Sequence, residues 1–196
     1  MKRTVTRLFD TQSQAEAAVR ELEAMGIDHN DLSIVAGRRS AEETRSFAAH
    51  ADGDSEAAEG AGKGAATGGA LGAGAGLLAG LGMLAIPGLG PVVAAGWLAS
   101  AAVGAVAGAA AGGAAGGLLG ALKDSGVPED DANVYAEGVR RGGTLVSVRV
   151  DETETPRVEA ALSGLNGVDA ATRGADYRQS GWTTFDETET PGAPFI

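Results

Sequence analysis

Hydrophobic and polar positions follow three different patterns along the chain. In both outer stretches short apolar segments alternate with polar ones, whereas no charged residue occurs between Lys63 and Lys123, a run of 59 positions. This contrast predicts an α/β domain that is split by an insert. The predicted regions are a first half of the domain (1–37), a flexible charged linker (38–59), a glycine-zipper helical hairpin (60–122), a second half of the domain (123–173) and a flexible tail (174–196).

The first outer stretch predicts a strand, a helix and a second strand. TVTRLF (4–9) and LSIVAG (32–37) have the composition of strands. Between them, Thr11 and Gln14 form a capping box, and Gly26 ends the helix. Its apolar face consists of Ala15, Ala18, Val19, Leu22 and Met25. The order strand, helix, strand favours a right-handed βαβ unit with parallel strands.

The second outer stretch predicts two helices around one strand. Pro128 takes the first position of a helix with an acidic first turn, and Gly142 stops it. Its buried face is expected to be Ala132, Tyr135, Ala136 and Val139. TLVSVRV (144–150) alternates as a half-buried strand does. A helix from Thr155 and Pro156 to Gly167 and a short strand near 168–172 follow. Together, the elements predict an α+β fold, a small ferredoxin-like sandwich split by the insert.

Within the insert, small residues recur at every fourth position. They are Gly60, Gly64, Gly68, Gly72, Gly76 and Gly80, and then Gly96, Ser100, Gly104, Gly108, Gly112, Gly116 and Gly120. Residues four apart share one face of a helix, so each helix would carry a groove of bare backbone. Pro87 and Pro91 would break a helix. We therefore predict helices over 60–86 and 92–122 that close into a hairpin by small-xxx-small packing.

The glycine content implies that these helices need a partner. They contain 10 and 8 glycines, and at roughly 0.8 to 1 kcal/mol each relative to alanine the sum is about 15 kcal/mol. That matches the whole stability of a typical domain, about 5 to 15 kcal/mol. We expect lipid or a protein to cover them.

Two hypotheses explain what would cover these helices. In the first, the hairpin enters a membrane tip first from the cytoplasmic face, because each helix is long enough to cross roughly 30 Å of hydrocarbon. The tip or interface residues would be Leu81, Leu84, Ile86, Trp97 and Leu98, with Lys63 and Lys123 at the headgroups. For Trp97, core packing fits the sequence equally well. In the second hypothesis, several hairpins bury their glycine faces against one another in a soluble, cytoplasmic homo-oligomer.

Charge and composition exclude several other functions. The formal net charge is −11 and the pI is about 4.6, and no stripe of Lys and Arg is present, which argues against a nucleic-acid partner. The absence of cysteine rules out disulfides and thiol chemistry and fits a reducing compartment. The start MKRTVTRLFD lacks the apolar run of a secretory signal.

No motif with a defined chemistry is present. The glycine-rich run matches neither G-x-x-x-x-G-K-[ST] nor G-x-G-x-x-G. His29 and His50 have no second histidine four residues away and no cysteine to join them, and the two DETET strings (151–155 and 186–190) lack the spacing of a calcium loop. No catalytic triad is indicated. We expect no catalytic residue, cofactor, metal or small-molecule substrate, and as partners a second copy of the chain or membrane lipid.

Three strings, in order, resemble a known family. VTRLFDTQSQAEAAVRELEAMGIDHNDLSIVA resembles the bacterial general stress protein domain, a family of heat-induced stress proteins. AIPGLGPVVAAGWLA and VYAEGVRRGGTLVSVRV resemble its members that bear a glycine zipper. The resemblance covers about residues 3–172. It implies a stress-linked bacterial protein, and it brings no established catalytic residue to this chain.

Overall fold

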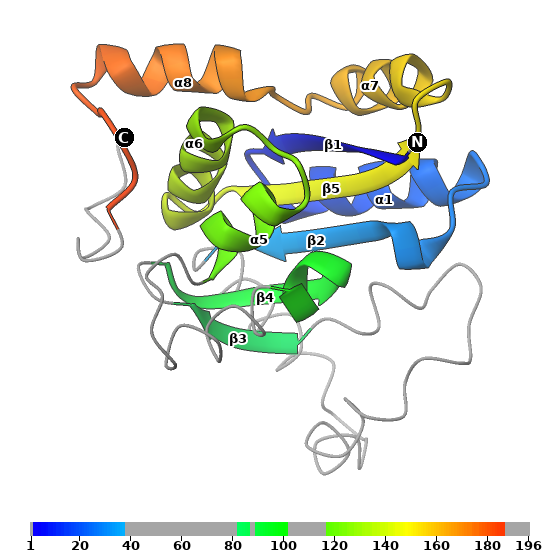
Figure 1. Cartoon of the computed structure of the whole chain (residues 1–196), viewed down its shortest axis with the longest axis horizontal. Helices are drawn as coiled ribbons and strands as arrows, with labels where there is room; N and C mark the ends of the chain where they lie inside the picture. The colour runs from blue at the N-terminus through cyan, green and yellow to red at the C-terminus, as the bar shows by residue number, and fades with distance from the viewer. Residues whose placement is uncertain (1, 38–81, 87–88, 102–116, 187–196) are drawn as a thin grey trace, which may run out of the picture.

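A single antiparallel sheet organises the molecule, with helices on both of its faces (Figure 1). The computed structural model describes residues 2–37, 82–86, 89–101 and 117–186. The strand order is β1-β5-β2-β4-β3, and the fold is therefore α+β. The strands are β1 (Lys2–Phe9), β2 (Leu32–Ala36), β3 (Gly82–Ile86), β4 (Gly90–Gly96) and β5 (Thr144–Asp151). The helices are α1 (Gln12–Ala24), α5 (Leu118–Asp124), α6 (Glu129–Arg140), α7 (Thr155–Gly164) and α8 (Ala170–Gln179).

The two outer stretches of the chain share this sheet. Strand β5 lies between β1 and β2 and is antiparallel to both, with Val148 opposite Val5 and also opposite Leu32. Strands β1 and β2 therefore run in the same direction, as the sequence predicts. They are not neighbours, however, because a strand from the second half of the domain takes the place between them.

The first predicted helix is confirmed as α1. The Thr11 side chain accepts a hydrogen bond from the backbone N–H of Gln14 at 3.3 Å, which caps the start of the helix. Gly26 follows its end with φ +90°, a conformation that suits glycine. The predicted residues Ala15, Ala18, Val19 and Leu22 are fully buried. They pack with α7 against one face of the sheet.

Helix α6 also forms where the sequence predicts it, on the opposite face of the sheet. Its first turn is acidic, its last turn contains Arg140, and Gly142 follows with φ +97°. Pro128 occupies the N-cap instead of the first helical position. The predicted face of Ala132, Tyr135, Ala136 and Val139 is buried.

Strand β5 is covered on both faces. Val146 and Val148 face α1 and α7, as their alternation predicts. Ser147, expected to be on a solvent face, is fully buried, and its hydroxyl lies 3.0 Å from that of Thr6. The prediction of a half-buried strand is wrong because α5 and α6 cover the second face (Figure 1).

The insert differs most from the prediction. Residues 82–86 and 92–96, expected to be helical, belong to β3 and β4, which pair with each other in antiparallel register. Strand β4 also pairs with β2, with Ala94 opposite Val35. The predicted helices are therefore wrong here, because these residues satisfy their backbone hydrogen bonds by extending the sheet. The chain reverses direction between the paired residues Ile86 and Gly90, within the stretch where the prolines predict a turn, although Pro91 itself lies in β4 opposite Ala85.

Helix appears later in the insert, as a short helical turn over 97–101 and as α5. The predicted linker (38–59) and most of the glycine series fall in 38–81 and 102–116, outside the described residues.

The flexible tail expected from Gly174 onward is wrong for residues 174–186. Gly174 lies inside α8, and the segment after α8 returns to the core. Tyr177 and Phe185 are each only 8% exposed, and Trp182 packs beside them. The short strand expected near 168–172 is reduced to a bridge between Leu8 and Val168. Burial of the aromatic side chains explains why this segment is ordered.

Candidate functional site

The structure describes three members of the fourfold glycine series, and they do not share one helix face. Gly96 ends β4 with φ +89°, Ser100 is exposed in the helical turn, and Gly120 is buried in α5. A Cβ atom at Gly96 would clash with the backbone of Leu32 and Ser33. Gly96 is therefore required by the close approach of its backbone to β2, where Ser33 is its register partner, and not by helix packing. The other members, Gly60 to Gly80 and Gly104 to Gly116, lie outside the described residues.

Part of the predicted membrane tip is buried in the core of the domain. Val92 and Leu98 lie in the core beside α6, with side chains that are 0% and 1% exposed. A position of Leu98 at a lipid-facing tip is wrong in this fold, because the domain itself buries the side chain. Leu84 and Ile86 belong to β3, whereas Lys63 and Leu81 lie outside the described residues.

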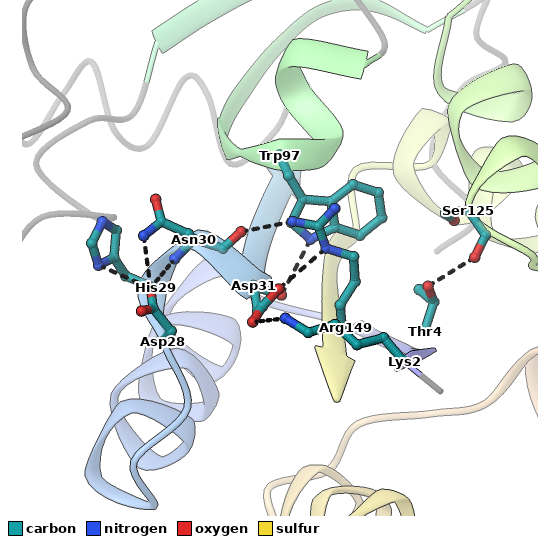
Figure 2. Close-up of polar contacts among 9 residues, drawn as sticks. All are labelled: Lys2, Thr4, Asp28, His29, Asn30, Asp31, Trp97, Ser125 and Arg149. Atoms are coloured by element: carbon teal, nitrogen blue, oxygen red, sulfur yellow. Dashed lines mark hydrogen bonds and ion pairs between the residues drawn. The ribbon is translucent and has the colours of Figure 1, made fainter. Parts of the chain in front are cut away.

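Trp97 anchors the insert to the domain (Figure 2). Its indole Nε1–H donates to the backbone oxygen of Asp31 at 3.2 Å. The guanidinium carbon of Arg149 lies 4.7 Å from the centroid of its ring, a cation–π geometry. Arg149 in turn donates to the backbone oxygen of Asn30 at 3.0 Å. Of the two roles that the sequence allows for Trp97, the structure shows packing on the domain.

Lys123, which the membrane hypothesis places at the lipid headgroups, makes an ion pair within the domain. Its Nζ lies 3.0 Å from Oε2 of Glu129, which joins the end of α5 to the start of α6. His29, on the 3-10 turn His29–Asp31, is exposed and lies 3.6 Å from Asp28. His50 lies outside the described residues.

A groove of about 490 Å³ follows the outer edge of β1. Its floor is formed by six consecutive residues, Lys2 to Arg7. One wall comes from the connection Ser125–Pro128 together with Asp131 and Tyr135 of α6. The other wall comes from Thr155 and Glu159 of α7. The volume lies in the range of ligand-binding sites, about 300 to 1,000 Å³. Sequence reasoning missed this site, because its residues come from three separate elements.

Tyr135 fixes the inner end of the groove. Its hydroxyl donates to the backbone oxygen of Thr6 at 2.8 Å and accepts from the backbone N–H of Ala170 at 3.1 Å. Burial raises the pKa of Tyr135 to about 12. The phenol is therefore neutral at ordinary pH and serves as a fixed structural bridge.

Two carboxylates near Tyr135 have opposite pKa shifts. Burial, followed by the nearby charges of Asp130 and Asp169, raises the pKa of Asp131. Asp169 caps α8 by accepting the backbone N–H of Thr172 at 2.7 Å, and this hydrogen bond lowers the pKa of Asp169. Both shifts have a structural cause.

A buried ionic cluster was also missed by sequence reasoning. The Glu137 side chain is 3% exposed, and its two oxygens lie 2.5 Å from Arg140 and 2.6 Å from Arg141. In sequence, these residues look like an ordinary pair of surface contacts three and four positions apart. The aromatic residues of 177–185, read from the sequence as a flexible arm, provide the burial.

Two further findings limit the chemistry of the described residues. Within 2–37, 82–86, 89–101 and 117–186, no group of three or more His, Cys, Asp or Glu side chains is placed to hold a metal ion. In the same part of the chain, no helix combines the length and the hydropathy needed to span a bilayer.

Comparison with protein-family models, curated proteins and solved structures gives no match to this chain.

Proposed function

We propose that this chain is a non-enzymatic, stress-associated bacterial protein that assembles with copies of itself through its glycine-rich segments. The observation that supports this choice is the burial of Val92 and Leu98 in the domain core. Leu98 is one of the apolar residues that a lipid-inserted hairpin would expose at its tip, and Val92 lies in the same apolar run. Because the domain uses them itself, self-association accounts better for the glycine series than tip-first insertion does.

The geometry of β3 and β4 supports this assembly. The first glycine series ends just before Gly82, and the register places Gly82 opposite Ala94, close to the start of the second series at Gly96. Strand pairing therefore holds Gly82, two residues after the end of the first series in sequence, close to Gly96, the first member of the second series. Neighbouring small-residue faces can then be presented together to another copy.

We also propose a ferredoxin-like core, in agreement with the resemblance to the general stress protein domain. Strands β1, β5 and β2 have the order and antiparallel directions of that core, and the Leu8–Val168 bridge lies where its remaining strand would pair. Helices α1 and α7 share one face. In this interpretation β3, β4, α5 and α6 are additions between the second and third core strands.

Membrane association is a second candidate function. It is favoured by the complete lack of charged residues from Gly64 to Leu122. In this alternative, the glycine-rich segments on either side of β3 and β4 contact lipid at the cytoplasmic face, while Trp97 and Leu98 stay with the domain.

Light scattering after gel filtration without detergent, combined with flotation on liposomes, tests both functions. Self-association predicts a discrete mass of several chains and no flotation. Flotation of the protein would support the membrane candidate, and a monomer that stays with the soluble fraction would contradict both. As a matched pair of variants, Gly72→Leu with Gly108→Leu should reduce the mass, whereas Ala73→Leu with Ala109→Leu should do so less.

A further inference from the structure

The groove beside β1 lies along a strand edge. Successive side chains of a strand point to opposite faces of the sheet. A cavity confined to one face would therefore touch alternate residues, yet this groove touches every residue from Lys2 to Arg7. The groove therefore runs beside the strand, along its backbone.

Backbone donors and acceptors of β1 point into this groove. The N–H and C=O of Leu8 bond to Val168 at 2.9 and 2.8 Å, which shows that Leu8 faces away from β5. Residues two apart in a strand share this direction, so the backbone groups of Thr4 and Thr6 face the same way. The Thr6 carbonyl accepts from Tyr135 and from Arg7. Within the described part of the chain, the bridge to Val168 is the one backbone pairing on this edge.

The charge of the groove is opposite to that of the whole protein. Lys2, Arg3 and Arg7 line it, against the carboxylates of Asp131 and Glu159, whereas the chain carries −11 overall. The Nε of Arg7 is buried and has no hydrogen-bond partner, and its Nη2 is 3.8 Å from Glu159. An extended peptide with acidic side chains would complement these cations.

The geometry points to strand addition at this edge by the chain's own C-terminal segment, from Asp186 to Ile196. This segment begins with DETETP, which repeats residues 151–156 letter for letter. The first copy already lies beside the same cations: Asp151 is opposite Lys2 in the sheet, and Glu152 is 3.6 Å from Arg3. A second copy would offer the outer edge the same chemistry.

The alternation of side chains in the DETET segment also matches that of β1. Along β1, Arg7 faces α7, where its Nη2 lies 3.8 Å from Glu159, and Arg3 shares this side because residues two apart in a strand point the same way. Thr4 faces the opposite side, where its hydroxyl donates to the backbone oxygen of Ser125 (Figure 2), and Thr6 shares that side. In DETET, carboxylates and threonines alternate in the same way. An added strand would place its glutamates on the arginine side and its threonines on the threonine side, both favourable cross-strand combinations.

The segment is long enough to reach the groove from its point of attachment. The backbone oxygen of Asp186 accepts from Nη1 of Arg140 at 3.4 Å, at the end of α6. Asp131 lines the groove from the first turn of the same helix, about 14 Å away along the helix axis. The ten residues after Asp186 span up to about 33 Å when extended.

Hydrogen exchange at single-residue resolution tests the proposal in the full chain and in a variant that lacks residues 187–196. The deletion removes none of the described residues, and circular dichroism checks its fold. We expect the Thr4 and Thr6 amides to exchange about tenfold faster in the deletion variant. A synthetic peptide of residues 186–196 should restore their protection. Equal exchange in the two proteins would overturn the proposal.

Two controls separate strand addition from general electrostatic attraction. A scrambled peptide of the same composition should not protect the Thr4 and Thr6 amides, and equal protection by it would also overturn the proposal. Arg3→Gln should weaken binding of the 186–196 peptide by about threefold to fivefold. Arg157→Gln, which alters an arginine of α7 outside the groove lining, should leave that affinity unchanged.

Discussion

The guanidinium carbon of Arg141 lies 4.2 Å from the centroid of the Tyr177 ring, which ties the end of α6 to α8. Arg140 makes a similar contact with Phe185 at 5.3 Å. Both arginines also bind the buried carboxylate of Glu137. These contacts explain why the chain beyond Gly174 belongs to the folded domain, although its sequence is mostly polar.

The ring of Tyr177 should account for a measurable part of the stability. Tyr177→Leu removes the cation–π contact and the edge contact with Trp182, whose ring centroid is 5.8 Å away. We expect the free energy of unfolding in urea to fall by about 1 to 3 kcal/mol. Tyr177→Phe keeps the ring and should cost less than about 1 kcal/mol. Similar losses in the two variants would argue against the ring contacts.

The stability of the protein should depend far more on the charge of Glu137 than on the charge of an exposed acidic residue. Glu137→Gln conserves the shape of the side chain but removes the negative charge that pairs with Arg140, whose side chain is 7% exposed. We expect the free energy of unfolding to fall by about 3 to 5 kcal/mol. Glu154→Gln, which breaks the exposed pair with Arg157, should change it by less than about 0.5 kcal/mol. Urea unfolding of both variants makes the comparison, and equal effects would show that burial of Glu137 is not important.

The substitution Gly96→Ala distinguishes the observed strand from the predicted helix, because the two structures predict opposite changes in the free energy of unfolding. In a helix, Gly96→Ala would raise the free energy of unfolding by about 0.8 to 1 kcal/mol. In the structure, φ is +89° and a Cβ atom would clash with Leu32, so we expect a loss of more than about 2 kcal/mol. Gly126→Ala, at φ +88° in open space, is the matched control and should cost about 1 kcal/mol. Stabilisation by Gly96→Ala would contradict the β4 assignment.

The outer elements could be predicted because local signals agree with the final fold. Helix α1 has a capping threonine and an apolar face of period 3.6, and α6 has charges that suit its dipole. The insert lacks such signals. An uncharged apolar run looks the same in a buried strand as in a buried helix, and the fourfold glycine spacing favoured the helix. The β-branched pair Val92 and Val93 was the local indication of a strand.

The groove and the buried Glu137 could not be predicted, because both depend on tertiary neighbours. Nothing in KRTVTR shows that Lys2 to Arg7 will form a sheet edge, since β5 takes the only inner position beside β1. Likewise, Glu137 has the spacing of a surface ion pair until Tyr177 and Phe185 cover it. A pattern along one element does not contain this information.

Trp97 should report that the insert stays on the domain. Trp97→Phe retains an aromatic ring for Arg149 but removes the hydrogen bond to Asp31. We expect it to lower the free energy of unfolding by about 0.5 to 1.5 kcal/mol, and Trp97→Ala by about 3 kcal/mol or more. In a Trp182→Phe background, addition of liposomes should leave the Trp97 fluorescence unchanged. A blue shift of its emission would contradict this placement of Trp97.

The two tyrosines should titrate over the same pH range, well above the ordinary pKa of a tyrosine. Burial raises the pKa of both Tyr135 and Tyr177 to about 12. The unfolded chain releases these protons near pH 10, whereas the folded chain retains them, so the folded state loses stability as pH rises from about 10 to 12. Each tyrosine contributes about 3 kcal/mol to this loss. Absorbance at high pH should show no ionisation step near pH 10 while the protein is folded.

Tyr135→Phe should remove half of the total absorbance change and leave the other half at about pH 12. The variant should also lower the free energy of unfolding at neutral pH by about 1 to 3 kcal/mol, because the buried N–H of Ala170 loses its acceptor. Tyr177→Phe should halve the absorbance change too, but without this loss at neutral pH, since its ring contacts remain. A normal step near pH 10 in either single-tyrosine variant would show that the remaining phenol is accessible to water.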